Sequence, residues 1–235
     1  MELGQPGSPV GRAETLRRKT GLLLPELFAA GQELIDHPRI GDLYPEYLFA
    51  THCIIRASVP LMEAALERAG STAGSDPVAA GLAEYLRRHI PEEMEHDEWL
   101  LDDLEVLGMA RSTVLARAPS PTVAGLVGAQ YYWIFHYHPV ALLGYVALLE
   151  GNPPSLALIE DLIASTGYSR RAFRTLIAHA ELDIRHRDEL YETLDGLLLT
   201  PQQTMVLGLS AMSSAHMLSR VIDEIVDGSG PGDCG

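Results

Sequence analysis

The sequence predicts an all-α protein. Apolar residues recur at helical spacing along most of the 235 residues, and no strictly alternating stretch lies between Asn-Gly or Asp-Gly hairpin turns. Apolar residues make up 47% of the chain and charged residues 21%, which is typical of a folded globular protein. A chain of this length is expected to form one large domain.

Seven helices are expected from the apolar pattern, with breaks where Pro or Gly interrupts it. Asp76 or Ser75 before Pro77, and Thr200 before Pro201, are typical helix starts. The short connections predict one compact bundle over residues 1–227, and the Gly-rich end is expected to be a disordered tail, 228–235. The predicted helices are 12–36, 41–70, 76–107, 121–149, 155–166, 169–195 and 201–227.

The charge and the number of cysteines exclude some kinds of binding partner and some kinds of metal site. Seventeen basic and 32 acidic residues give a net charge of -15, so neither nucleic acid nor an anionic membrane is an expected partner. No apolar run near the N-terminus is long enough for a signal segment or membrane span, so a cytoplasmic location is predicted. Two cysteines, Cys53 and Cys234, allow neither a disulfide framework nor a CxxC metal site. A metal site would therefore use His and carboxylates.

The clearest candidate for such a site is a row in helix 169–195. His179, Asp183 and His186 stand at i, i+4 and i+7, which places them on one helix face. Two imidazoles and a carboxylate on a rigid element suit a divalent first-row metal. The alternative is a solvated polar stripe, because neighbours such as Glu181 indicate that part of this helix is exposed.

Two more segments offer ligands. Glu93 and His96 have the i, i+3 spacing found in carboxylate-bridged di-iron bundles, although an acidic helix also produces it by chance. Glu150 closes the apolar stretch 139–149, where a buried carboxylate would need a partner such as a metal. Otherwise Glu150 stands at an exposed helix end.

The second predicted helix carries one polar stripe of His52, Arg56, Glu63 and Glu67. If this stripe faces inward, Glu63 can bind metal and Arg56, about 10 Å away, can hold a substrate carboxylate. If it faces outward, it is an ordinary solvated face. Pro60 is expected to tighten or kink the helix just before Glu63.

Taken together, the candidate ligands are four carboxylates and three imidazoles without a thiolate. This set favours non-haem iron or manganese over structural zinc, and its charges balance two ferrous ions. The candidates are Glu63, Glu93, His96, Glu150, His179, Asp183 and His186.

Three segments, 89–104, 137–151 and 179–186, resemble the haem-oxygenase-like di-iron oxidases and oxygenases, also called iron-containing redox enzymes. The resemblance spans nearly the whole chain and implies that family's helical fold and the ligands named above, with Glu63 as a further one. Some members carry another carboxylate one or two turns before the ExxH pair, where this chain has Leu86 and His89. His89 or Glu92 is then either a substitute ligand or a neighbour that supports the ligands.

The resemblance also implies an activity and its cofactors. Members use O2 as co-substrate, two Fe(II) ions and an external electron donor, and Mn is an alternative metal. Their small amino-acid-like, amine or fatty-acid substrates undergo desaturation, N-oxygenation or C–C cleavage, and a role in specialised metabolism is expected. The iron pair would be loosely held, with helix 179–195 able to shift without metal.

Other functions on the same scaffold stay open. A metal-free or haem-binding helical protein would leave the ligand rows unexplained, and a thiaminase-like hydrolase would need a nucleophile for which Cys53 is the only helix-borne candidate. Iron storage or a role in protein interaction is a non-enzymatic alternative. A homodimer is one assembly that the sequence allows.

Polar and aromatic residues of the fourth predicted helix are candidates for a substrate pocket. Tyr132, His136 and Tyr145 recur there at helical spacings and would either line the pocket or belong to the core. His138, just before Pro139, is either a hydrogen-bond partner of a ligand or a core histidine with its own partners.

Overall fold

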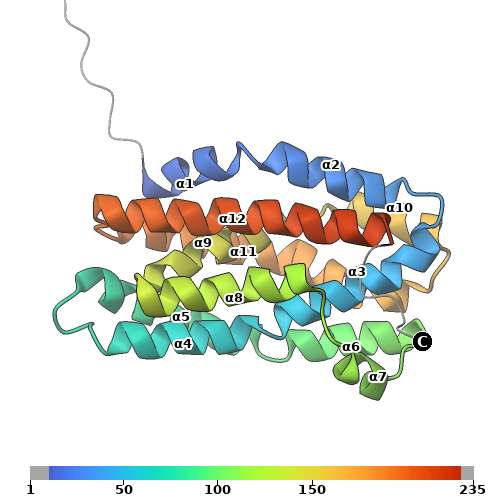
Figure 1. Cartoon of the computed structure of the whole chain (residues 1–235), viewed down its shortest axis with the longest axis horizontal. Helices are drawn as coiled ribbons and strands as arrows, with labels where there is room; N and C mark the ends of the chain where they lie inside the picture. Colours follow the sequence, from blue (N-terminus) through green and yellow to red (C-terminus); the bar gives the residue numbers. More distant parts are fainter. Residues whose placement is uncertain (1–10, 229–235) are drawn as a thin grey trace, which may run out of the picture.

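Helices make up most of the computed structural model, which describes residues 11–228. Within these residues the chain forms twelve α-helices and two short 3-10 helices, and no strand, so the all-α prediction is confirmed. Apart from Gly228, the predicted tail 228–235 lies outside the described residues. The elements are α1 Arg12–Thr20, α2 Leu24–Ile35, α3 Ile40–Ile55, α4 Ser58–Gly70, α5 Pro77–Glu93, α6 His96–Val106, α7 Arg111–Ala116, α8 Pro121–His136, η1 Pro139–Ala141, α9 Leu142–Leu149, α10 Leu156–Thr166, η2 Arg170–Phe173, α11 Arg174–Gly196 and α12 Pro201–Val226 (Figure 1).

The count of seven helices is wrong, because four of the long predicted helices are divided and α7 was not predicted. Pro25, Pro60 and Pro139 lie in the first turns of α2, α4 and η1. A proline has no amide N–H to donate to the preceding turn, so a helix begins readily at proline but does not continue smoothly through it. The predicted disturbance at Pro60 is present as a break between α3 and α4, just before this residue.

The predicted helix starts at Pro77 and Pro201 are present, each with a side-chain cap. Asp76, rather than Ser75, accepts hydrogen bonds from the amides of Val78 and Ala79. Thr200 forms a reciprocal capping box with Gln203. These caps satisfy amide groups that have no partner within the helix.

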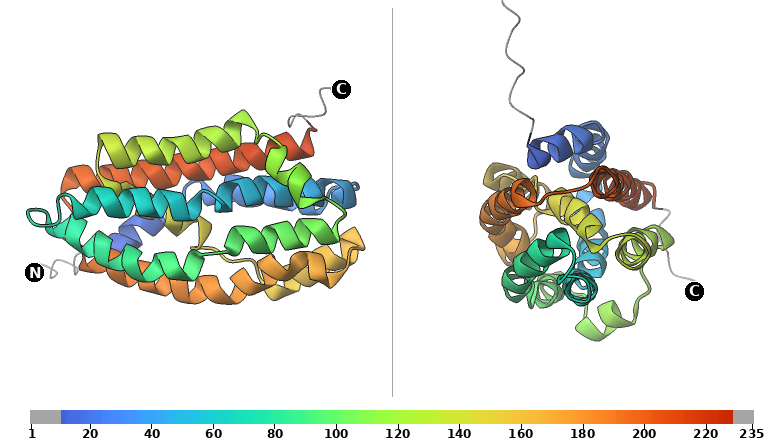
Figure 2. Two further views of the ribbon diagram at one scale, coloured as in Figure 1. Left: turned by 90° about the horizontal axis from the view of Figure 1, so that it is seen from below. Right: turned by 90° about the vertical axis from the view of Figure 1, so that its left-hand side faces the viewer.

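The short helix α9 lies in the middle of the bundle. The end-on view in Figure 2 shows α9 surrounded by longer helices, and residues Leu142–Leu148 are all buried. Gly144 lets α9 approach α12 closely, since a Cβ at this position would collide with the carbonyl oxygen of Leu207. The position of α9 brings Glu150, which caps its C-terminal end, into the interior.

The longest helix, α12, is part of the bundle and contacts α1, α2, α8 and α9. By length and composition it could cross a membrane, but 56% of its most apolar window is buried inside the protein. Its buried Ser210 and Ser214 bind the amide of Gln130 on α8. These contacts are those of a core helix.

A polar contact joins the start of α5 to η1. The second oxygen of the Asp76 carboxylate accepts a hydrogen bond from His138 Nε2 at 2.8 Å, while His138 Nδ1 accepts from the amide of Val140. Burial raises the pKa of Asp76, but the hydrogen bonds from His138 and from the amides of Ala79 and Val78 outweigh it, so the net pKa lies below its ordinary value.

Replacing Asp76 by Ala is expected to lower the free energy of unfolding by about 1–2 kcal/mol near neutral pH, because a helix cap is lost. Since the folded-state pKa is depressed, this contribution is present above the unfolded-state pKa of about 4 and is lost as the pH falls through the folded-state value. Urea unfolding at neutral pH and at several values below about pH 4 measures the difference.

A matched control is Asp161→Ala, which removes an exposed aspartate on α10. It should change the free energy of unfolding by less than about 0.5 kcal/mol at each pH. Equal effects of the two variants, or an Asp76 effect that grows on acidification, would contradict the expectation.

Candidate metal centre

Seven of the predicted or alternative ligands meet in the interior where four helices converge. All are buried except His179, which is half-buried. They come from the end of α5, the start of α6, the end of α9 and the middle of α11. The residues are His89, Glu93, His96, Glu150, His179, Asp183 and His186.

Glu93 and His96 are neighbours in space, but not for the reason that their spacing indicated. The helix ends at Glu93, Met94 is extended, and Glu95 has a left-handed backbone with φ of 71°. Glu93 therefore ends α5 and His96 begins α6. The two still meet, with His96 Nδ1 3.2 Å from Glu93 Oε2.

Four of these residues form a compact group that could hold a metal ion. His89, Glu93, Glu150 and His186 each offer one ligand atom, and these atoms all lie within 4.8 Å of one another. His89 Nε2 is 3.1 Å from Glu150 Oε1, and His186 Nδ1 is 3.3 Å from Glu93 Oε1. The group combines imidazole nitrogen and carboxylate oxygen, which is a donor set for first-row metals such as iron.

A second set of ligand-type groups adjoins the other oxygen of Glu93. His96 contacts Glu93 Oε2, as described above, and its ring meets that of His179 edge to face with centroids 4.8 Å apart. His179 Nδ1 is in turn 2.9 Å from Asp183 Oδ1. The Glu93 carboxylate thus lies between two sets of ligand-type side chains and turns one oxygen toward each.

The cluster contains several buried polar atoms that have no hydrogen-bond partner. A buried polar atom without a partner costs stability, and a metal ion bound by these atoms would remove that cost. The residues present therefore fit a metal site. Among these atoms are Glu93 Oε1, Glu150 Oε2, His179 Nε2 and His186 Nδ1.

Burial and the contacts between the side chains shift the pKa values of the cluster in different directions. Burial raises the pKa of Glu150 to about 7, although its hydrogen bond with His89 acts in the opposite direction. Burial lowers the pKa of His89, but the hydrogen bond and negative charge of Glu150 outweigh it, and the net shift is upward. Burial raises the pKa of Glu93, but the contacts with His96 and His89 outweigh it, and its net pKa is lowered. A divalent cation would displace protons from such a cluster.

His186 is supported from the side that faces away from Glu93. Its Nε2 lies 3.2 Å from Glu92 Oε2, and Glu92 Oε1 accepts a hydrogen bond from Arg185 at 2.9 Å. A carboxylate behind a metal-binding histidine fixes the ring and makes it a better ligand. Glu92 therefore has the position of a supporting group, one of the two roles that the sequence left open for it.

Two predicted site residues on α3 and α4 do not join the cluster. Glu63 is exposed on α4, and Arg56 is exposed at the end of α3. Of the stripe expected there, only His52 is buried. Arg56 follows it one turn later at the exposed end of α3, and Glu63 and Glu67 are exposed beyond the break, on α4. The inward-facing stripe was therefore wrong, and neither Glu63 as a ligand nor Arg56 as a substrate clamp fits these positions.

The residues proposed from the fourth predicted helix are also placed differently. Tyr132 and His136 are exposed on α8, so they line no interior pocket. Tyr145 is buried on α9, and its hydroxyl has no hydrogen-bond partner. His138 binds Asp76 at the start of α5, whereas the cluster lies near the end of this 17-residue helix, so His138 supports the fold rather than a ligand.

Two residues near the cluster were missed. Tyr85 lies one turn before His89 and stacks on its ring, with centroids 5.0 Å apart; this i, i+4 spacing was the signal that could have found it. Asp103 on α6 accepts a hydrogen bond from the amide of Thr175 at 2.9 Å and so fixes the start of α11. No local pattern in the sequence indicates that contact, because 72 residues separate the two partners.

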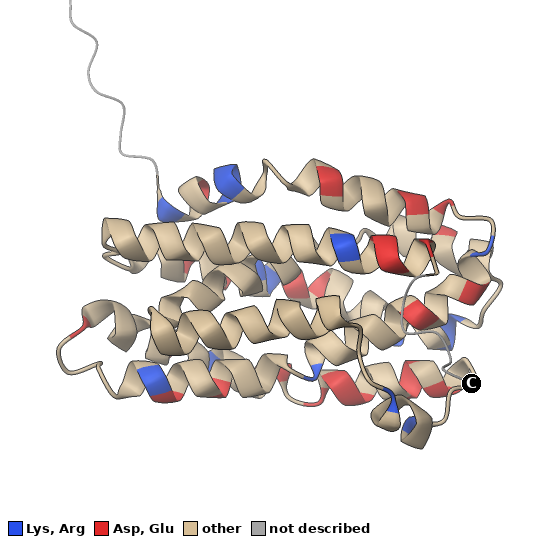
Figure 3. Cartoon of the chain, in the orientation of Figure 1, with Lys and Arg blue, Asp and Glu red and all other residues tan. Residues whose placement is uncertain are grey.

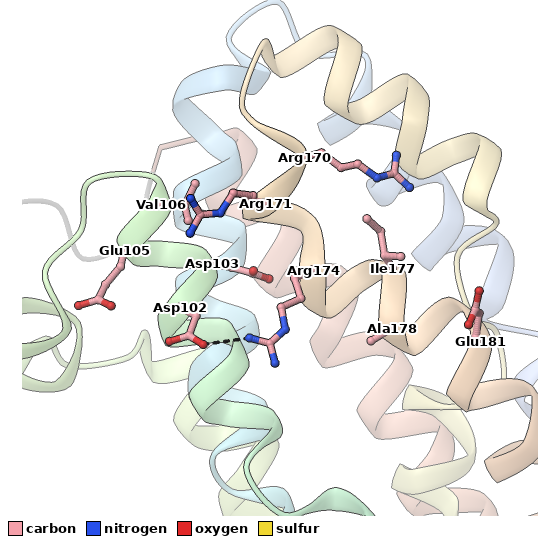
Figure 4. Close-up of a pocket in the computed structure, with 10 residues that line it drawn as sticks. All are labelled: Asp102, Asp103, Glu105, Val106, Arg170, Arg171, Arg174, Ile177, Ala178 and Glu181. Atoms are coloured by element: carbon pink, nitrogen blue, oxygen red, sulfur yellow. Dashed lines mark hydrogen bonds and ion pairs between the residues drawn. The ribbon is translucent and has the colours of Figure 1, made fainter.

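A charged groove lies between α6 and the start of α11 (Figure 4). Its volume is about 1130 Å³, and it is lined by acidic and basic side chains, with Arg174 binding Asp102 at 3.1 Å. Ile177 and Ala178 also line it and directly precede His179 in the chain. The groove thus runs along the helix that carries three of the ligand candidates.

Comparison with known proteins identifies the family. The sequence model of the proteins described as iron-containing redox enzymes matches residues 69–216, which is more than half of the chain and includes the whole cluster. The chain belongs to the iron-containing redox enzyme family. The resemblance noted in the sequence is thereby confirmed.

Solved structures show that this family member has a haem-oxygenase-like fold. A domain of unknown function with that fold from Shewanella denitrificans is 20% identical, with a TM-score of 0.77 over 94% of both chains. A TenA homologue from Pseudomonas syringae is 12% identical, with a TM-score of 0.71 over 97% of this chain and 100% of the other. A CADD-like protein of unknown function from Nostoc punctiforme is 18% identical, with a TM-score of 0.71 over 92% and 97%. No curated protein sequence matches this chain.

Metal binding to the cluster is expected to stabilise the folded protein. Adding Mn(II) to chelator-treated protein should raise Tm, because the ligands are assembled only in the folded state; the gain is about 2.7 kcal/mol at about 100 times Kd. Glu93→Gln should lose most of this rise, since Glu93 contacts both sets of ligand-type side chains. Thermal unfolding followed by circular dichroism, with and without Mn(II), gives the measurement.

The control is Glu63→Gln, which changes an exposed glutamate on α4 in the same way. This variant should keep the full rise in Tm. If Glu63→Gln loses the rise and Glu93→Gln keeps it, the metal does not bind at the cluster.

Proposed function

We propose that the protein is a non-haem di-iron enzyme that uses O2 and an external electron donor to oxidise a small molecule. The observation that carries this proposal is the position of Glu93, with one carboxylate oxygen facing His186 and the other facing His96. A carboxylate in that position is suited to join two metal ions, as in other carboxylate-bridged di-iron bundles. Membership of the iron-containing redox enzyme family supports iron as the metal.

Each set of side chains would hold one ion. His89, Glu150 and His186 would bind the first, and His96, His179 and Asp183 the second, with Glu93 shared. Two ferrous ions held there, or manganese as an alternative, would supply electrons and open coordination positions for reaction with O2. With Glu63 excluded, three ligand carboxylates remain, and Glu92 behind His186 provides a fourth negative charge nearby.

The protein's own residues would exclude water from the site and hold the metal ligands in fixed orientations. The apolar helix α9 ends beside the site at Glu150, and its buried side chains would limit the access of water from that side. Stacking of Tyr85 fixes the plane of the His89 ring, and Glu92 holds His186 from behind. Rigid support of this kind keeps ligands in place during a reaction.

The substrate is proposed to be a small amino-acid-like molecule, an amine or a fatty acid that undergoes desaturation, N-oxygenation or C–C cleavage in specialised metabolism. The groove beside α11 supports the amino-acid-like class, because its lining has both guanidinium and carboxylate groups to pair with a zwitterion. Arg171, which lines this groove, would hold the carboxylate of such a substrate in place of Arg56. The net charge of -15 disfavours nucleic acid and anionic membrane as partners, and a cytoplasmic location is part of the proposal.

The alternative functions have weaker support. A thiaminase-like reaction needs a reactive thiolate, whereas Cys53 is buried and its burial raises the pKa of the thiol. A metal-free protein would leave the unpartnered atoms of the cluster uncompensated, and a single haem-binding histidine would account for only one of them.

Anaerobic titration of the chelator-treated protein with Fe(II), followed by exposure to O2, tests the proposal. We expect two iron ions per chain and iron-dependent O2 consumption in the wild type. His179→Ala should bind about one ion less and consume O2 at least about tenfold more slowly, because one set of ligands is incomplete. Iron content is measured by metal analysis and O2 consumption with an oxygen electrode.

His216→Ala is the matched control, since His216 is exposed on α12. It should behave like the wild type. The absence of stoichiometric iron binding, or binding that is the same with and without His179, would refute the di-iron function. Mass spectrometry of candidate substrates then separates loss of two hydrogens, gain of oxygen and shortening of the carbon chain.

A further inference from the structure

Helix α8 is exposed along one side yet has no charged residue in its 16 residues. The neighbouring helix α12 has none from Pro201 to Ser219. In Figure 3 the ribbons of these two helices are tan, without Lys, Arg, Asp or Glu, apart from the C-terminal end of α12. In a chain with a net charge of -15, such a surface is unusual.

Large apolar side chains gather at one end of this surface. The two helices are antiparallel, since Thr122 binds Glu224 at one end and Gln130 binds Ser210 farther along. The last turns of α8 therefore lie beside the first turns of α12. The exposed residues at this end, which we call the aromatic patch, are Tyr132, Phe135, Tyr137, Met205 and Leu209, each 45–53% exposed.

The rings of the aromatic patch support one another. Tyr132 is 6.0 Å from Tyr137 and 4.7 Å from the ring of His136, and Phe135 stacks parallel to Tyr131 at 6.4 Å. Rings ordered in this way lose little further freedom when a partner covers them. Aromatic and Met side chains are also enriched in the cores of protein interfaces, where charged residues are depleted.

We propose that the aromatic patch and the uncharged surface around it form the interface between two copies of this chain. Two molecules that each carry a charge of -15 repel one another, and contact through an uncharged face brings no like charges together and buries no unpaired carboxylate. A partner protein recognised by charge would find no complementary charge there. A membrane surface fits poorly, because the patch lacks the Lys and Arg residues that anchor interfacial helices.

The shape of the surface suits a pair of copies related by a two-fold axis. Ala124, Gly128 and Tyr132 are exposed along α8 at four-residue intervals, so small side chains leave room beside an aromatic one. In a two-fold interface the same patch occurs on both partners, and the aromatic end of one copy can cover the small residues of the other. Two adjacent helices about 24 Å long form a face of about 500 Å², or about 1,000 Å² over both copies before side-chain relief is counted, which is about the least that a specific interface buries.

The test is sedimentation velocity of the full chain over a range of concentrations. We expect the wild type to have twice the 25.6 kDa mass of one chain. Leu209→Glu should weaken association at least tenfold, because the two-fold axis introduces two negative charges at once. Tyr132→Glu, on the other helix, should do the same, and circular dichroism verifies that each variant is folded.

Leu156→Glu is a matched control, since Leu156 and Leu209 are both 45% exposed and Leu156 lies on α10, away from the patch. This variant should remain dimeric. A monomeric wild type at every concentration would overturn the proposal, as would equal weakening by Leu156→Glu and Leu209→Glu. A monomeric wild type that sediments with neutral phosphatidylcholine vesicles would instead assign the patch to a membrane.

Discussion

Imidazole and carboxylate groups are buried together at the centre of this structure. The free-energy cost of burying them constrains how the surrounding side chains are arranged. Each such group would be more stable in water, and in the interior each depends on its neighbours for compensation. The Glu93 carboxylate is central, because it is in contact with histidines from both α6 and α11. The surrounding apolar helices keep the cluster away from solvent. The contacts within the cluster in turn join the helices that carry its residues, α5, α6, α9 and α11.

The break between α5 and α6 shows how the backbone meets this constraint. In a continuous helix, Glu93 and His96 would project in similar directions from the same axis. The left-handed Glu95 instead ends one helix and starts another, so the two side chains approach the cluster from separate elements. A non-glycine residue in that conformation is uncommon and has an energetic cost, which is consistent with a functional constraint on the connection.

The sequence predicted the helical class and most members of the cluster, for reasons that differ among the residues. His179, Asp183 and His186 could be predicted because one continuous helix fixes their spacing. To predict that Glu150 is buried, one would have to know that α9 lies in the middle of the bundle, and this depends on how all the other helices pack. Glu63 was misplaced because one long helix was expected where the helix breaks before Pro60, and Arg56 because it lies at the exposed end of α3. His89 was left undecided because its partner Glu150 is 61 residues away. Local periodicity describes neighbours along the chain, whereas the cluster is made by contacts between distant segments.

The contrast between α9 and α11 bears on how a metal could enter a buried site. Helix α9 is enclosed by other helices, so its amide groups are expected to exchange with solvent only when much of the bundle opens. Helix α11 has exposed residues such as Glu181, Ile184 and Arg185, and its first turn is tied down by Asp103. A local opening of α11 would expose its histidines while Glu150 stayed in place. Such a partial fluctuation would let an ion reach or leave the cluster at a smaller free-energy cost than global unfolding.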